Sequence, residues 1–101
     1  MTTLVHLELQ LDPRKTDTEV AELLQEVLSA TRAFSGCLDL EVVVDDADPT
    51  RLLVIETWAA ASDHDAYVAW RGTPEGTSRL GELLAAPRVK RTFTRRIPLA
   101  L

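Results

Sequence analysis

Four side chains suited to binding an aromatic molecule lie close together in this sequence: Trp58, His64, Tyr67 and Trp70. The last three are spaced three residues apart, so on a helix they would lie along one face. Such a face would make a pocket wall that is mostly apolar with a few polar groups, as in small-molecule sites. His64 could accept a phenolic proton at neutral pH, since its unperturbed pKa is about 6.5, and Tyr67 could hydrogen-bond a phenol or quinone oxygen.

Each of these residues also has a purely structural interpretation. Trp58 could fill space in the core, and His64 lies between two aspartates, where it could simply be solvated. A basic run near the C-terminus has the same two interpretations. It consists of Arg88, Lys90, Arg91, Arg95 and Arg96. The run could be a solvated strand face with ion pairs, or one of its members, such as Arg95, could hold an anion or phenolate at a pocket or subunit boundary.

Two further ionisable residues are predicted to be structural. His6 lies on the polar side of the first strand beside Glu8, and a pairing between His6 and a carboxylate is expected. Glu56 shares one side of its strand with Trp58, so a buried Glu56 would need a cation or a hydrogen-bond donor. An ion pair with an arginine of the last strand is the expected partner.

No metal or cofactor is predicted. The two histidines and the single Cys37 are too far apart in sequence for a metal-ligand motif, and no glycine-rich phosphate loop is present. A lone cysteine excludes an intrachain disulfide scaffold, and Cys37 is expected to be a buried, inert thiol.

The sequence predicts a small cytoplasmic protein of one domain. Its 101 residues suit a single domain, 1–101, and a net charge of −5 argues against a general nucleic-acid binder. No apolar run approaches the roughly 20 residues that span a bilayer, and no leader segment precedes the first strand.

The first half of the chain predicts a strand, a helix and a hairpin. Residues Leu4–Leu11 alternate between apolar and polar side chains, which is typical of a half-buried strand. Thr16 and Glu19 form a capping box at the start of a helix that ends before Gly36. Two apolar strands then follow, joined by a turn at residues 45–49 and ending at Trp58.

The second half predicts two short helices and a last strand. Ser62 and Asp65 suggest a cap for the first of these helices, and Thr73 with Pro74 suggests the start of the second. Pro87 ends that helix, and residues Val89–Ile97 are predicted to form the last strand. The resulting order, strand–helix–strand–strand–helix–helix–strand, is that of an α+β, ferredoxin-like split βαβ fold with an antiparallel four-stranded sheet.

A homodimer is predicted on physical grounds. A four-stranded sheet with helices on one face leaves its other face uncovered, and Val43, Leu53 and Ile55 would lie there. A soluble monomer seldom exposes such a patch, so two sheets are expected to pack face to face.

The segment Phe34–Trp58, FSGCLDLEVVVDDADPTRLLVIETW, resembles the central hairpin of the antibiotic-biosynthesis-monooxygenase family. The resemblance implies a dimeric α+β barrel and a cofactor-independent oxygenation of quinols or polyketides. It also implies that Trp58 contacts the ligand. Haem-degrading relatives use an Asn in the first strand and a His in the second helix. This chain has Leu7 or His6 at the first position and Tyr67 or Val68 at the second, which disfavours haem.

The predicted function is therefore oxidation of a phenol or hydroquinone by O₂ without metal or flavin. His64 and Tyr67 are the predicted catalytic residues, and Trp58, Trp70 and Arg95 are predicted to bind the substrate. A non-catalytic, ligand-binding or stress-associated barrel and a polyketide cyclase remain as alternatives.

Overall fold

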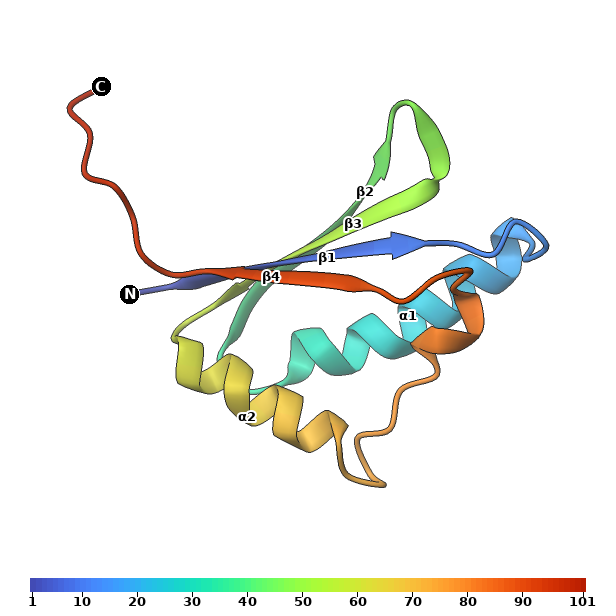
Figure 1. Cartoon of the computed structure of the whole chain (residues 1–101). Coiled ribbons are helices and arrows are strands. Elements are labelled where there is room, and N and C mark those ends of the chain that lie inside the picture. The colour runs from blue at the N-terminus through green and yellow to red at the C-terminus, as the bar shows by residue number, and fades with distance from the viewer.

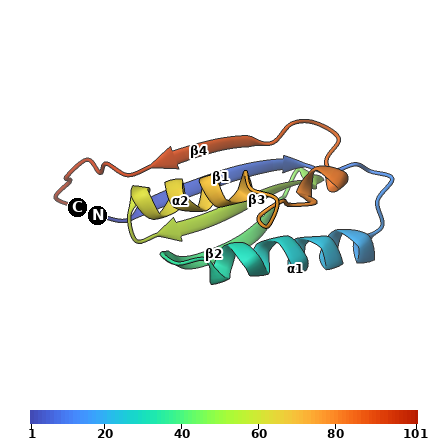
Figure 2. The ribbon, with the colours of Figure 1, turned by 90° about the horizontal axis from the view of Figure 1, so that it is seen from below.

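A four-stranded antiparallel sheet carries helices on one face only (Figures 1 and 2), as the computed structural model of residues 1–101 shows. The elements are β1 (Thr3–Gln10), α1 (Asp17–Ala33), β2 (Cys37–Asp45), β3 (Asp48–Trp58), α2 (Ala61–Arg71), the 3-10 helix η1 (Leu80–Leu83) and β4 (Val89–Phe93). The strand order is β2-β3-β1-β4. The α+β ferredoxin-like fold is confirmed.

The core lies between the sheet and the helices. Alternate residues of β1 and β3 point toward the helices because side chains along a strand alternate between its two faces. The buried set comprises Thr3, Val5, Leu7 and Leu9 of β1 and Leu52, Val54, Glu56 and Trp58 of β3. Only Thr3 and Glu56 are polar, so the alternation that places apolar side chains in the core also places one carboxylate there.

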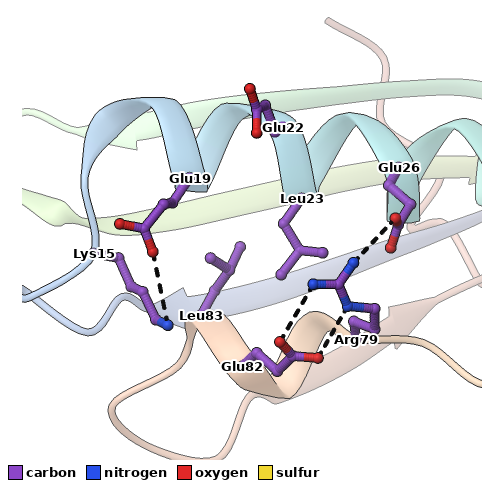
Figure 3. Close-up of a pocket in the computed structure, with 8 residues that line it drawn as sticks. All are labelled: Lys15, Glu19, Glu22, Leu23, Glu26, Arg79, Glu82 and Leu83. Carbon is purple, nitrogen blue, oxygen red and sulfur yellow. Dashed lines mark hydrogen bonds and ion pairs between the residues drawn. The ribbon is translucent and has the colours of Figure 1, made fainter.

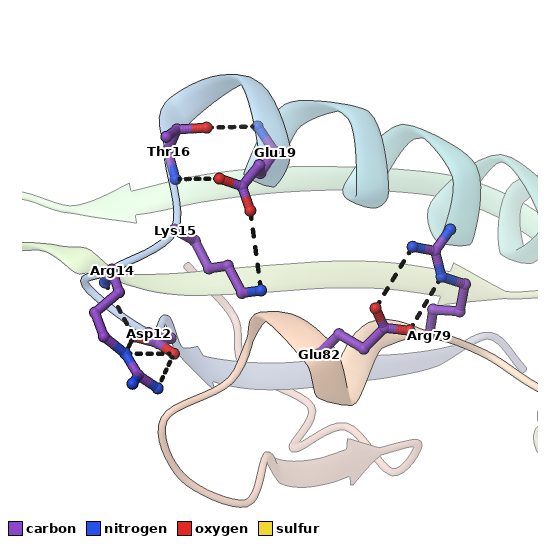
Figure 4. A network of polar contacts seen from close by, with 7 residues as sticks. All are labelled: Asp12, Arg14, Lys15, Thr16, Glu19, Arg79 and Glu82. Carbon is purple, nitrogen blue, oxygen red and sulfur yellow. Dashed lines mark hydrogen bonds and ion pairs between the residues drawn. The ribbon is translucent and has the colours of Figure 1, made fainter.

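Helix α1 begins at the predicted capping box. The backbone amide of Glu19 donates to the Thr16 hydroxyl at 3.1 Å, and the Thr16 amide donates to the Glu19 carboxylate at 3.3 Å (Figure 4). These bonds satisfy amides that the first turn of a helix leaves unpaired. None of the helices is long and apolar enough to cross a membrane.

Gly36 makes the turn from α1 into β2. Its φ of +93° lies in the region that glycine adopts freely, and a Cβ placed there would lie 2.4 Å from Asp63 of α2. The Gly36 carbonyl accepts a hydrogen bond from the Ala59 amide at 2.8 Å. This turn therefore brings the end of α1, the end of β3 and the start of α2 close together.

An ion-pair network links α1 to η1. Arg79 reaches Glu26 of α1 at 3.3 Å and Glu82 of η1 at 3.0 Å, and Lys15 lies 3.9 Å from Glu19. These side chains line a polar surface hollow with Leu23 and Leu83 at its base (Figure 3). Exposed pairs of this kind each contribute about 0–1 kcal/mol. The network helps to hold η1 against α1, and its charged groups already pair with one another.

The helix predicted after Gly72 is much shorter than expected. The predicted side-chain cap of α2 does not form. The Thr73 hydroxyl donates back to the Trp70 carbonyl at 2.6 Å, residues 74–76 form a turn, residues 77–79 are irregular, and only η1 is helical. Helix α2 starts at Ala61 because Ala60 is the extended N-cap residue, with no side-chain cap. Ser62 therefore lies inside the helix and does not cap it.

The last strand is shorter than predicted. It ends at Phe93, which pairs with Leu4, and its only neighbour β1 begins at Thr3. Residues beyond 94 therefore have no strand with which to pair. As a result, Arg95 lies outside the sheet and is exposed.

The face of the sheet opposite the helices is uncovered (Figure 1). The cross-strand register places Val43 beside Leu53, and Ile55 beside His6, on this face. Phe93, paired with Leu4, extends the apolar surface onto β4, as its exposed side chain shows. The predicted location of Val43, Leu53 and Ile55 is confirmed.

We predict that Gly36→Ala destabilises the fold by about 1–3 kcal/mol, because alanine at this φ is strained and its Cβ would collide with Asp63. The matched control is Gly81→Ala, since no atom lies within 4 Å of a Cβ at Gly81. That control should stay within about 0.5 kcal/mol of the parent. Urea unfolding measures both, and equal losses in the two variants would contradict the prediction.

Candidate functional site

A cavity of about 390 Å³ lies between the covered face of the sheet, α1, α2 and the segment 77–81. Its volume is in the range of about 300–1,000 Å³ that is usual for small-molecule sites. Apolar lining comes mainly from β1 and α1, and polar lining from β3, α2 and the start of β4. The ionisable side chains that line the cavity are Glu56, His64, Tyr67, Arg71, Arg88 and Lys90.

His64 lines this cavity and is 5% exposed, so the solvated alternative is wrong. Its ring packs against the edge of Trp58, with centroids 5.5 Å apart. Burial lowers the pKa of His64, and the nearby charge of Lys90 lowers that pKa further, while Asp65 opposes the shift. The shift favours the neutral imidazole, which can accept a proton.

Tyr67 lies one helical turn further along α2, with its hydroxyl held from two sides. Arg71 Nε donates to the Tyr67 hydroxyl at 2.8 Å, and the Thr31 hydroxyl of α1 is hydrogen-bonded to it at 2.7 Å. The two bonds fix the position of the phenol oxygen at the cavity wall. Residues three and four apart on a helix share a face, so α2 presents His64, Tyr67 and Arg71 together.

Arg71 joins α2 to α1 and was not identified from the sequence. Its Nη2 donates to the Val27 carbonyl at 2.8 Å and to the Thr31 hydroxyl at 3.0 Å, and its Nη1 donates to the Gly76 carbonyl at 3.3 Å. The guanidinium also lies 4.9 Å from the Trp70 ring. The i,i+4 spacing from Tyr67 was the signal that could have indicated its role.

Glu56 is buried at the cavity wall beside Trp58. It is 4% exposed, and its Oε1 accepts a hydrogen bond from the Trp58 indole Nε1 at 2.8 Å. The predicted ion pair with an arginine of the last strand is absent, because the indole of the residue two positions on supplies the donor instead. Burial raises the pKa of Glu56, although the bond from Trp58 and the charges of Lys90 and Arg71 partly oppose this. A raised pKa makes Glu56 a stronger base than an ordinary carboxylate.

Trp58, Trp70 and Arg95 do not line the cavity. Trp58 is completely buried behind its wall, against the rings of His64, Tyr67 and Phe34. Trp70 packs on Phe34 with centroids 5.5 Å apart and supports Arg71. The exposed Arg95 follows the end of β4. Two other members of the basic run, Arg88 and Lys90, line the cavity instead.

The remaining candidates lie elsewhere. His6 is on the uncovered face, 5.1 Å from the Phe93 ring, and its expected carboxylate Glu8 pairs with Arg91 at 3.3 Å. The predicted pairing of His6 with a carboxylate is therefore absent within this chain. Cys37 is buried as predicted, and burial raises the pKa of its thiol. No group of three His, Cys, Asp or Glu side chains gathers in a way that could hold a metal ion.

Comparison with known proteins identifies one family. The sequence model of the family described as antibiotic biosynthesis monooxygenase matches residues 2–77. That range includes β1 to β3, both α-helices and the residues Glu56, His64, Tyr67 and Arg71. None of the curated proteins matches the chain significantly.

Solved structures share the fold at low sequence identity. A conserved protein from Methanosarcina mazei Go1 has a TM-score of 0.80 at 19% identity, with 95% of this chain and 94% of that chain covered. The Rv0793 protein from Mycobacterium tuberculosis has a TM-score of 0.74 at 19% identity, covering 99% and 100%. A variant of SnoaB, a cofactor-independent oxygenase from Streptomyces nogalater, has a TM-score of 0.78 at 12% identity, covering 97% and 96%. At these identities the similarity shows the fold alone.

We predict that Glu56→Gln is more stable than the parent at pH 7. The pKa of Glu56 is higher in the folded protein than in the unfolded chain, so ionisation of this carboxyl lowers the free energy of unfolding. This loss of stability grows as the pH rises above the unfolded pKa of about 4.3. Glutamine is uncharged and keeps an oxygen for the Trp58 indole. The advantage should therefore disappear as the pH approaches 4.

Chemical unfolding from pH 4 to pH 8 measures this effect. The matched control is Glu75→Gln, which changes an exposed carboxylate just after α2, away from both faces of the sheet. Lower stability of Glu56→Gln at pH 7, without the same loss in Glu75→Gln, would show that the buried carboxylate is not destabilising.

Proposed function

The chain belongs to the antibiotic biosynthesis monooxygenase family, and we propose that it oxidises a phenolic or hydroquinone-type aromatic substrate with O₂, without a metal or flavin. The main support for this proposal is that two proton acceptors line the same cavity. Glu56 comes from β3 and His64 from α2, and the fixed hydroxyl of Tyr67 lies on the same wall. This combination suits a reaction that starts from a substrate anion.

The proposed chemistry uses only the substrate and O₂. A base removes the phenolic proton, and the anion passes one electron to O₂. The substrate radical and superoxide then combine at a ring carbon that carries a hydrogen, and the resulting peroxide anion takes the proton back from the base to give a hydroperoxide. Cleavage of the O–O bond with loss of that hydrogen converts the carbon to a carbonyl and releases water, so one oxygen atom enters the product and the other leaves as water. All the electrons come from the substrate, which explains why no cofactor is needed.

In this proposal each site residue has a defined role. His64 or Glu56 takes the phenolic proton, and the Tyr67 hydroxyl orients a substrate oxygen. Trp58 acts through its hydrogen bond to Glu56 and is a positioning residue. Trp70 supports Arg71, which in turn holds Tyr67. The two tryptophans thus shape the site from behind its wall.

The alternative functions make different demands on the cavity. A non-catalytic binding barrel would be favoured by an apolar cavity with His64 in solvent. This cavity instead contains buried Glu56 and His64 together with Arg71. A polyketide cyclase would use the same acid–base groups but no O₂, so oxygen dependence separates it from a monooxygenase.

We also propose that two copies pair through their uncovered sheet faces and form a cytoplasmic homodimer. Leu53, Ile55 and Phe93 add apolar side chains to this face, and helices cover only the other face (Figure 1). A second copy of the same sheet presents a surface of matching size and apolar character. Stable interfaces of this kind bury on the order of 2,000 Å² or more.

We predict protein-dependent O₂ uptake with 1,4-dihydroxynaphthalene or anthrone, measured with an oxygen electrode. Removal of the proton acceptor should lower kcat by about a hundredfold or more in His64→Gln or Glu56→Gln. The control is Glu75→Gln, an exposed carboxylate just after α2. Uptake that is unchanged in both site variants would refute their roles, and turnover without O₂ would favour the cyclase.

We predict that Ile55→Glu converts the dimer to a monomer, because two copies of the new carboxylate would be removed from water at the interface. Analytical ultracentrifugation should show a change from twice the mass of the chain to the mass of one chain. Thr18→Lys, at an exposed position of α1, is the control and should stay dimeric. A monomeric parent protein would refute the proposed assembly.

A further inference from the structure

The cavity has an excess of positive charge in a chain whose net charge is −5. Arg71, Arg88 and Lys90 line it, and Glu56 is its only carboxylate. None of these three cations has a carboxylate within 4.0 Å, whereas Arg14, Arg79 and Arg91 all do. An uncompensated group of cations around a cavity attracts anionic ligands.

Arg71 differs from the other two cations in its hydrogen bonding. Its nitrogen atoms already donate to Tyr67, Thr31 and the carbonyls of Val27 and Gly76. The side chains of Arg88 and Lys90 make no hydrogen bond or ion pair with the protein, so their donors are free to meet a ligand.

The sheet register aims Lys90 at the cavity, and Arg88 lies just before β4. Lys90 pairs with Leu7 across β1 and β4, and Leu7 points toward the helices. Arg88 precedes Lys90 by two residues and lines the same cavity. The charge of Lys90 acts on both proton acceptors, since it lowers the pKa of Glu56 and of His64. An anion bound by Lys90 would therefore lie beside the groups that take the phenolic proton.

We propose that Arg88 and Lys90 form an anion subsite at the rim of this cavity, and that the substrate is an aromatic compound with a carboxylate in addition to its reactive hydroxyl. Two cationic side chains can together hold the two oxygens of one carboxylate. The choice of substrate class rests on the proposed monooxygenase function, whereas the existence of the subsite does not.

The subsite also couples substrate binding to base strength. A bound carboxylate neutralises the charge of Lys90, which removes an influence that lowers the pKa of Glu56 and of His64. Both groups then hold a proton more strongly.

Binding of a matched ligand pair tests the subsite without any turnover. 1-Hydroxy-2-naphthoate and 1-naphthol differ by one carboxylate, and calorimetry at low salt measures their affinities for the parent protein. The naphthoate should bind at least about tenfold more tightly, and this preference should fall several-fold in Arg88→Gln and Lys90→Gln. Arg95→Gln changes the same charge in the same basic run, outside the cavity, and should keep the preference.

A second readout is the pKa of His64, measured by NMR, with His6 on the opposite face as the internal reference. The naphthoate should raise the pKa of His64 in the parent protein but not in Lys90→Gln, and 1-naphthol should have no such effect.

Equal affinities for the two ligands, no binding of either at about 1 mM, or loss of the preference only in Arg95→Gln would each overturn the subsite. Failure of the proposed function is a separate result. In that case O₂ uptake is absent, while the carboxylate preference and its dependence on Lys90 are still observed.

Discussion

The hydrogen bond from the Trp58 indole to the Glu56 carboxylate is the interaction on which the candidate site depends. Both residues belong to β3, two positions apart, so the alternation of the strand places them on the same, covered face. A carboxylate in such a position loses its hydration and needs a donor. Trp58 supplies that donor at one oxygen, and the residue still lines the cavity, where it can meet a substrate. The hydrogen bond therefore lets a buried carboxylate remain at the cavity wall.

The rest of the site is arranged around this pair by the two α-helices. The turn at Gly36 brings the end of α1 close to the start of α2, and α2 then places His64 and Tyr67 against Trp58. Arg71 ties α2 to Thr31 and Val27 of α1. These bonds cross between helices, so they hold the cavity open at a fixed width. A collapsed core would exclude a substrate from the same space.

The two faces of the sheet differ in what covers them. The face under the helices supplies the cavity, and the other face supplies the surface on which we propose that a second copy packs. β4 contributes to both, because Lys90 points to the cavity while Phe93 points to the open face. An interface on the open face would therefore fix the edge strand that carries the proposed anion subsite. Assembly and ligand binding would be linked through one short strand.

The sequence by itself determined the elements and their faces, because period and capping are local properties. The alternation in β1 and β3 predicted the core and the open face, and the capping box at Thr16 predicted the start of α1. The strand end at Phe93 and the turns after Gly72 were not predictable in this way, since they depend on where β1 begins and on which partner the Thr73 hydroxyl finds. The partners of the ionisable side chains were also decided only by the tertiary structure. Glu56 pairs with an indole, and the cations at the cavity are Arg71, Arg88 and Lys90 instead of Arg95. Charge and spacing along a chain show which groups are available, but burial and distance in the folded protein decide which of them meet.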